Sequence, residues 1–332
     1  MEVNHTQQLF FNHIRSKLPS HLSFVDEVAE LLNISNDSAY RRIRGEKPLG
    51  LDEVQVLCDK YQVSLDQLLR IKTDTVIFTY DKVDHLSSGL NKYLQFVANS
   101  LGLFNILQNP QMYFYSKDLP TYIFMPFPEL MAFKFFFWKR TLLGYPELAR
   151  QRFNGEEADA EAIETAGKIY ELYTKIPSID IWNDESINAT ISQIEFYRQS
   201  NVFISNDVLF KVYNQLEELV NHLELQAETG KKLLYGKPDR RTNVSYDAYI
   251  NTTLIGNNTV FVQSDNRRIT FINHNGLNFM STQDEGFCDF TFKHIQTVIQ
   301  KSTHISVVGE KERSMFFNAL RQKIQEQIRN IN

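Results

Sequence analysis

The stretch that most constrains the fold lies near the amino end, where SFVDEVAELLNISNDSAYRRIRG runs from Ser23 to Gly45. Ser23 precedes apolar residues at helical spacing, and a serine oxygen at a helix start accepts a hydrogen bond from an orphan backbone N–H. Asn33 stands where the chain must turn, because asparagine tolerates the left-handed backbone conformation better than most residues. Ser35 marks a second helix start, and Gly45 ends that helix. The sequence therefore predicts two short helices joined by a tight turn.

The second of these predicted helices has an inward and an outward face. Ala39 and Ile43 have the spacing of the inward face. The outward face is polar and consists of Asn36, Asp37, Ser38, Tyr40, Arg41 and Arg44. Residues 36–47 contain four basic side chains and two acidic ones. This local excess of positive charge favours an anionic partner.

The helix pair resembles the helix-turn-helix of the phage repressor and Cro family. The segment GEKPLGLDEVQVLCDKYQVSLDQLL looks like the fourth and fifth helices of that family, so the resemblance covers about residues 5–70. The predicted core face of the fourth helix consists of Leu51, Val54, Leu57 and Tyr61. In that family the second helix of the pair lies in the major groove of double-stranded DNA. The resemblance therefore implies a DNA partner.

The resemblance also implies which residues touch DNA. Asn36 and Asp37 match the first recognition-helix residues, where asparagine can pair with adenine and aspartate can accept from cytosine. Arg44 and Lys47 are expected on phosphates. The complete set of predicted DNA-binding residues is Ser23, Ser35, Asn36, Asp37, Ser38, Tyr40, Arg41, Arg42, Arg44 and Lys47.

Two points about this set stay open at the level of sequence. Arg42 stands where the family often has an apolar residue, and its head is expected in solvent or on a phosphate. The alternative interpretation of the whole set is that Asp37 only complements the helix dipole and the arginines form a solvated face.

Composition and motifs restrict the remaining functional classes. A net charge of -5 argues against coating by nucleic acid, whereas a sequence-specific regulator needs only a basic reading face. Cys58 and Cys288 do not have the spacing of a disulfide or metal-binding motif. The sequence shows no signal peptide and no run of 18 apolar residues. No histidine has a companion at metal-ligand spacing. We therefore expect a cytoplasmic protein without membrane contact, metal, cofactor or catalytic residues.

The expected fold class is α+β. An all-α helix-turn-helix domain is predicted over residues 1–72, followed by a larger mixed α/β region over 73–332 with an antiparallel sheet and long helices. This region is also open to division into a sheet-bearing part, 73–155 with 235–332, and a helical part, 156–234. Strands are expected over 76–80 and 111–115 on either side of a helix over 86–107. Residues 244–281 predict an antiparallel meander, with Asn275-Gly276 as its strongest hairpin signal. Further helices are predicted over 161–175, 186–199, 206–228, 290–299 and 310–328.

Three segments allow two interpretations each. Thr121–Leu143 is dense in aromatic residues and forms either buried core or the wall of a ligand pocket. The apolar seam Leu209–Leu223 pairs two protomers or packs within one domain. The basic segment Gly230–Arg241 is a solvated connector or a second DNA contact.

Taken together, these patterns predict a bacterial, cytoplasmic transcription regulator that binds an operator. Its second region is expected to form a homodimer and to take a small-molecule effector. Two alternatives remain at this stage: an interaction scaffold that uses the helical amino-terminal domain, and an enzyme with a regulatory DNA-binding domain.

Overall fold

The computed structural model describes residues 5–19, 21–69, 75–80, 83, 89–115, 117–157, 159–237, 241–253 and 258–331. The chain divides into two compact units, Met1–Ile77 and Phe78–Asn332. Each unit has its own hydrophobic core.

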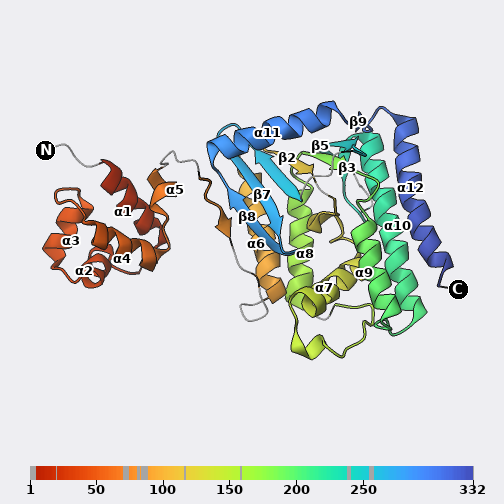
Figure 1. Cartoon of the computed structure of the whole chain (residues 1–332), viewed down its shortest axis with the longest axis horizontal. Coiled ribbons are helices and arrows are strands. Elements are labelled where there is room, and N and C mark those ends of the chain that lie inside the picture. The colour runs from red at the N-terminus through yellow and green to blue at the C-terminus, as the bar shows by residue number, and fades with distance from the viewer. Residues whose placement is uncertain are drawn as a thin grey trace. The chain divides into compact units, whose positions relative to one another are not determined.

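The smaller unit consists of helices and the loops between them, with no strand among its described residues. Its helices are α1 (His5–Lys17), α2 (Phe24–Leu31), α3 (Asn36–Ile43), α4 (Leu51–Tyr61) and α5 (Leu65–Leu69) (Figure 1). Ala29 and Ala39 are buried on α2 and α3, and such small side chains let two helices approach closely. Leu51 was predicted in the core, and this is wrong: it is 85% exposed, because α4 begins there and its first turn extends past the packed core.

The larger unit combines a sheet with long helices, so the α+β class is confirmed. Its helices are α6 (Gly89–Asn105), η1 (Thr121–Ile123), α7 (Pro128–Phe137), η2 (Trp138–Leu142), η3 (Pro146–Leu148), α8 (Ala160–Tyr173), α9 (Asn188–Gln199), α10 (Asn206–Thr229), α11 (Glu285–Gln300) and α12 (Glu310–Arg329). Its strands are β1 (Thr79–Tyr80), β2 (Gln111–Tyr115), β3 (Ser178–Trp182), β4 (Lys231–Leu233), β5 (Arg241–Ile250), β6 (Thr259–Gln263), β7 (Arg268–His274), β8 (Asn278–Thr282) and β9 (Thr303–His304).

The sheet is mixed. Its strand order is β1-β8-β7-β6-β2-β3-β5-β4, with β9 added to β5. The pairs β2–β3 and β3–β5 are parallel, and the remaining pairs are antiparallel. Strand β3 lies inside this order, between β2 and β5, so the segment 156–234, predicted as a helical part, contributes an interior strand as well as β4 at one end.

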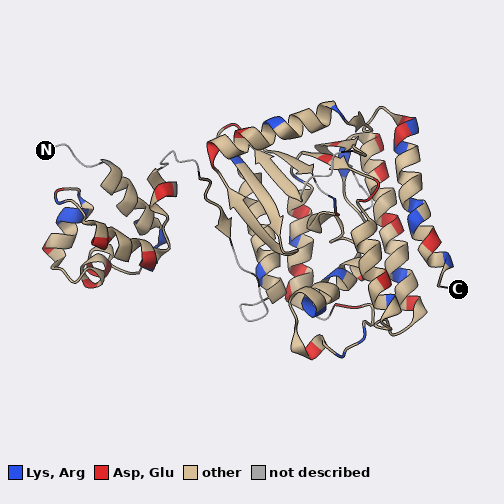
Figure 2. Cartoon of the chain, in the orientation of Figure 1, with Lys and Arg blue, Asp and Glu red and all other residues tan. Residues whose placement is uncertain are grey.

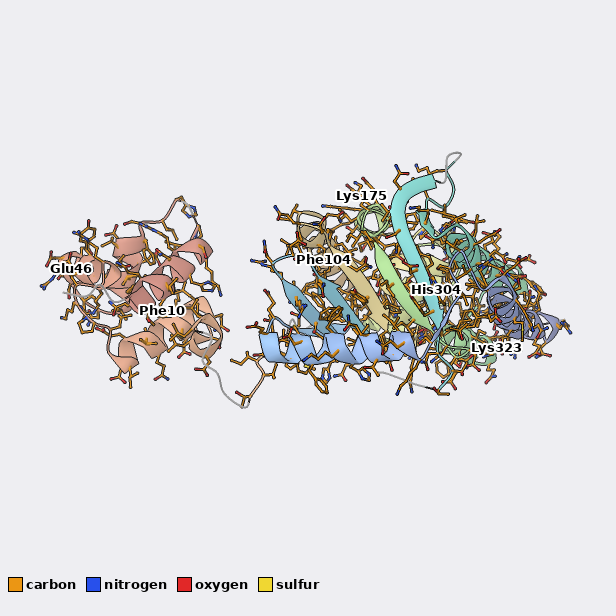
Figure 3. The ribbon with its side chains drawn as sticks, turned by 90° about the horizontal axis from the view of Figure 1, so that it is seen from above. Phe10, Glu46, Phe104, Lys175, His304 and Lys323 are labelled. Carbon is orange, nitrogen blue, oxygen red and sulfur yellow. The ribbon has the colours of Figure 1, made fainter. Side chains whose placement is uncertain are left out.

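The two faces of the sheet are covered differently. Helix α11 packs on one face through Cys288, Ile295 and Val298, while the main core, with α6, α8 and α10, covers the other. Figure 3 shows α11 along one side of the strands. Any cavity in the main core is therefore enclosed by sheet on one side and helices on the other.

Several predicted elements are confirmed, and some are corrected. Strand 111–115 is β2, whereas the strand predicted over 76–80 is reduced to β1, and residues 86–88 of the predicted helix lie outside the described residues. The antiparallel meander consists of β6, β7 and β8, but β5 leaves it to pair in parallel with β3. Asn275 and Gly276 both have positive φ, 53° and 79°, as the hairpin between β7 and β8 requires.

The apolar seam of α10 packs within the larger unit. Its five residues at three- and four-residue spacing are at most 4% exposed; they are Leu209, Val212, Leu216, Leu219 and Leu223. They belong to the main core, next to α7 and α12. Protomer pairing through this seam is therefore excluded in the folded chain. Among the described residues, no helix combines the length and apolar character needed to cross a membrane.

Candidate nucleic-acid interface and internal pocket

The turn between α2 and α3 has the local geometry that its residues favour. Asn33 adopts the left-handed conformation with φ 52°, and the Ile34 N–H donates to the Ala29 carbonyl at 2.9 Å. The Ser35 side chain caps α3 by accepting from the Ser38 N–H at 3.3 Å. Ser23 precedes α2, but its side chain makes no capping hydrogen bond. The start of α3 is therefore fixed more firmly than the start of α2.

Most of the predicted DNA-binding residues lie on the surface of this unit. The exposed ones are Ser23, Ser35, Asn36, Asp37, Tyr40, Arg41, Arg44 and Lys47. Ser38 is half-buried. Figure 2 shows the basic residues on α3 and on the loop after it, with acidic residues on neighbouring helices of the same unit. The structure thus brings one polar helix face and one loop together, and it leaves Ser23 at the start of the preceding helix.

Several of these side chains already have partners. The Asn36 amide donates to Asp26 Oδ1 at 2.7 Å, which bridges α3 and α2. Arg44 lies 5.4 Å from the ring centroid of Tyr40. Glu46 pairs with Arg41 at 4.0 Å and with Arg44 at 3.3 Å. Because both arginines are more than half exposed, these ion pairs are weak and can be exchanged for phosphate contacts.

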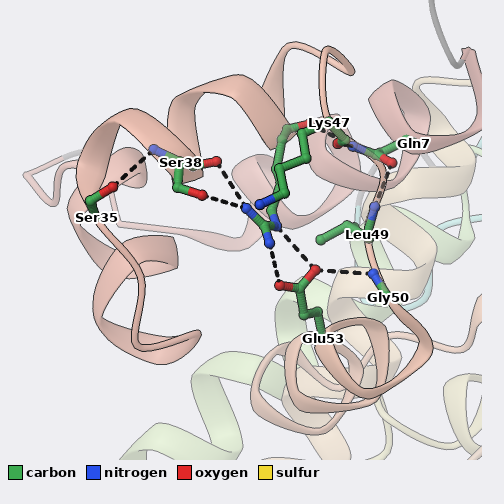
Figure 4. A network of polar contacts seen from close by, with 8 residues as sticks. Gln7, Ser35, Ser38, Lys47, Leu49, Gly50 and Glu53 are labelled. Carbon is green, nitrogen blue, oxygen red and sulfur yellow. Dashed lines mark hydrogen bonds and ion pairs between the residues drawn. The ribbon is translucent and has the colours of Figure 1, made fainter.

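Arg42 does not belong to the exposed face, so its prediction as a DNA-contacting residue is corrected. It is 6% exposed, and its guanidinium donates to both carboxylate oxygens of Glu53, at 2.7 and 3.0 Å. It also donates to Ser38 Oγ at 2.6 Å (Figure 4). The bidentate geometry links α3 to α4. Arg42 therefore positions α3, although sequence reasoning placed its head in solvent or on phosphate.

Gln7 is a second positioning residue, and sequence reasoning missed it. It is 6% exposed, and its amide nitrogen donates to the carbonyl oxygens of Arg42 and Lys47 at 2.7 and 2.8 Å. Its amide oxygen accepts from the Leu49 N–H at 3.0 Å (Figure 4). One side chain of α1 thus fixes the loop after α3. A polar residue among the apolar positions of α1 was the only signal for this role.

Glu53 completes the network at the start of α4. Its carboxylate accepts from the Gly50 N–H at 3.0 Å in addition to the two bonds from Arg42. The hydrogen bond from Arg42 holds the pKa of Glu53 below its usual range, and the Gly50 N–H acts in the same direction. The carboxylate is therefore charged at neutral pH and satisfies the buried guanidinium.

The larger unit contains a pocket of about 170 Å³ in its main core. Nine of its lining residues are aromatic: Tyr93, Phe96, Phe104, Phe114, Tyr122, Phe124, Trp138, Phe271 and Phe279. The segment Thr121–Leu143 supplies part of this lining and is also largely buried in the core. The segment is therefore buried core that also lines a pocket, and ligand binding by this pocket stays a prediction.

A buried acid and a buried lysine lie close together in the main core. Asp180 of β3 and Lys232 of β4 are 1% and 0% exposed, and Lys232 Nζ lies 3.4 Å from the ring centroid of Tyr173. Burial raises the pKa of Asp180 and lowers the pKa of Lys232, while their mutual attraction opposes both shifts. Within Gly230–Arg241, Lys232 is therefore a core residue and neither solvated nor available to DNA, whereas Lys231 and Lys237 are exposed and residues 238–240 lie outside the described residues.

Known proteins give no further assignment. Comparison found no match among family models, curated proteins or solved structures. Within the described ranges, no group of histidine, cysteine, aspartate and glutamate residues could hold a metal ion. The functional inference therefore depends on the exposed face of α3 and on the pocket.

Proposed function

We propose that the chain is a bacterial, cytoplasmic regulator of transcription that binds double-stranded DNA through α3. The observation that carries this proposal is a short, capped helix with an exposed polar and basic face, held from behind by a buried ion pair. Asn36 and Asp37 stand at the start of the helix, where recognition helices contact base edges. A rigid support matters because recognition needs side chains fixed to within a fraction of an ångström.

Each part of the proposed interface has a separate task. Asn36 and Asp37 would read base edges, since their amide and carboxylate groups match adenine and cytosine. Arg41, Arg44 and Lys47 would contact phosphates and set affinity without sequence information. The proposed regulator acts as a homodimer, because one α3 covers only a half-site. Its operator is then an inverted repeat with half-sites about one duplex turn apart.

The test begins with selection of random duplexes by the purified full chain. An enriched inverted repeat supports the proposal, and no enrichment contradicts it. The double variant Arg41→Ala with Arg44→Ala should then weaken binding to the selected duplex at least about tenfold. The slope of log K against log salt concentration should also decrease in magnitude by about two, one for each lost phosphate contact.

A matched control removes the same charge elsewhere. The double variant Arg15→Ala with Lys60→Ala changes two exposed cations on α1 and α4. It should keep most of the affinity and most of the salt slope, because general electrostatic attraction alone is altered. Equal losses in the two double variants, with circular dichroism and melting unchanged, would contradict a specific role for α3.

One observation favours a second candidate function, an interaction scaffold in which this unit binds protein. Leu51 is 85% exposed and Leu9 is 45% exposed, and apolar side chains in water are suited to a protein contact. Salt separates the two functions. Binding to DNA falls steeply with ionic strength through counterion release, whereas a largely apolar protein contact does not.

A further inference from the structure

The pocket of the larger unit contains a buried cation whose hydrogen-bond partners are neutral. Lys134 of α7 is 3% exposed and lines the pocket. Its Nζ donates to Thr190 Oγ1 at 3.1 Å and to Gln193 Oε1 at 2.8 Å, and both acceptors are neutral. Among the described residues, Lys134 forms no ion pair. A lysine ammonium has three N–H donors, and these two acceptors occupy two of them.

Such a group is costly inside a protein. Buried charges are normally paired with an opposite charge, because transfer of an isolated ion from water is strongly unfavourable. Burial accordingly lowers the pKa of Lys134, and attraction to Asp118, which also lines the pocket, opposes that shift. The Phe124 ring lies 5.5 Å from Nζ and offers only a weak attraction. An anionic ligand in the pocket would remove the mismatch.

The size and walls of the pocket define the rest of the ligand. An apolar cavity of about 150 Å³ accommodates a benzene molecule, and this pocket has about 170 Å³. It therefore has room for one ring or a short alkyl chain with a small polar group, about 8–10 non-hydrogen atoms in all. The aromatic walls match the apolar portion, and Gln193 lies beside Lys134 to accept or donate a further hydrogen bond.

The walls are rigid where they surround Lys134. Trp138 packs edge-on against both Tyr93 and Phe124, each with ring centroids 5.6 Å apart. Trp138 also opens η2, a π-helical turn that continues α7. Single π turns inside helices occur frequently at functional sites. The irregular turn thus places an aromatic wall beside the cation.

We propose that this pocket binds a small apolar monocarboxylate, with the carboxylate on Lys134 Nζ and the ring or alkyl chain among the aromatic side chains. Binding itself stands on the pocket alone, and only its meaning as an effector signal rests on the proposed function. The other charged residue of the lining is Asp118, which is half-buried. Its charge already attracts Lys134, so a bound carboxylate would share the ammonium with Asp118.

The test is calorimetric titration of the full chain with benzoate, phenylacetate and hexanoate, each compared with its primary amide. The amides have nearly the same shape and no charge. At least one acid should bind about tenfold or more tightly than its amide, because a charge-assisted hydrogen bond is stronger than a neutral one. Absence of binding by all three acids, or equal binding of acids and amides, would overturn the proposal.

Two variants locate the site. Lys134→Met should erase the preference for acid over amide, whereas Lys293→Met, an exposed lysine on α11, should leave it unchanged. If Lys134→Met does not fold, Val97→Phe tests the site instead. This substitution on α6 fills the pocket and leaves Lys134 in place. Loss of acid binding in Val97→Phe supports the site, and retained binding overturns it. The ligand titrations contain no DNA, so a negative result in them does not bear on the duplex-binding assays. A negative result in the duplex-binding assays likewise does not bear on the ligand titrations.

Discussion

The pair between Arg42 and Glu53 allows a direct test of how α3 is supported. Glu53→Ala removes the carboxylate that the buried guanidinium contacts and leaves Ser38 as its remaining side-chain partner. Removing one member of a buried pair costs about 3–5 kcal/mol. The Glu53 side chain is 24% exposed, so water can replace part of the lost contact. We therefore expect a loss of about 2–3 kcal/mol in the free energy of unfolding of the smaller unit.

Hydrogen exchange followed by mass spectrometry measures this loss locally. A small helical domain has a stability of only about 3–5 kcal/mol, so the variant should lose most of the protection in α3 and α4. A loss of 2–3 kcal/mol corresponds to exchange about 30–150-fold faster. Peptides from α10 in the larger unit provide an internal reference that should not change.

The matched control is Glu46→Ala, which removes an acid whose partners are more than half exposed. Its effect on the same peptides should stay below about 0.5 kcal/mol. Similar exchange in the two variants would refute the assignment of Arg42 and Glu53 as the support of α3. A second check replaces both charges, as Arg42→Met with Glu53→Leu, which should recover much of the stability because no buried charge remains.

The same pair predicts a pH dependence with a definite sign. Arg42 lowers the pKa of Glu53 in the folded chain, below the value of about 4.3 expected in the unfolded chain. The stability that the pair contributes is therefore fully present above that value and is lost as pH falls through the lower, folded-state pKa. Protection of α3 and α4 should decrease over this acidic range. Glu53→Gln should lack this component of the pH dependence.

Four further outcomes are expected. Glu46→Gln should strengthen duplex binding about three- to tenfold in gel-shift titrations, because the acid no longer competes with phosphate for two arginines. Lys232→Met should lower the free energy of unfolding of the larger unit in urea by about 3–5 kcal/mol, and adding Asp180→Asn should restore part of it. Gly167→Ala should raise the melting temperature, since a Cβ there meets nothing within 4 Å and alanine is worth about 0.5–1 kcal/mol in a helix. Gly309→Ala should lower it, since φ is 70° and the Cβ would lie 2.6 Å from a backbone oxygen.

The parts of the fold that could be predicted are those set by local rules. Ser35 and Asn33 were assigned correctly because a cap and a left-handed turn depend on neighbouring residues only. The Asn275-Gly276 hairpin follows for the same reason. Leu51 was misassigned because periodicity places a residue on a face of a helix but does not show where the neighbouring helices end.

The parts that could not be predicted depend on contacts between distant segments. Strand β3 was missed because Asp180 interrupts its apolar residues, and its partner Lys232 lies 52 residues further along the chain. Only the sheet brings the two together, through β5, which pairs with both β3 and β4. An acid in a strand and a lysine in a basic stretch each look solvated when they are considered alone.

Arg42 and Lys134 show how a buried cation can be assigned to support or to ligand binding. Both are nearly fully buried, at 6% and 3% exposure, on helices next to a candidate site. Arg42 has a bidentate carboxylate and a serine hydroxyl, so its charge is matched within the protein and nothing further is required. Lys134 has two neutral acceptors and is attracted by Asp118 without forming an ion pair with it, so an anion that enters the pocket would be its direct charged partner. The difference lies in the partners rather than in burial, and burial alone would have placed the two residues in the same class.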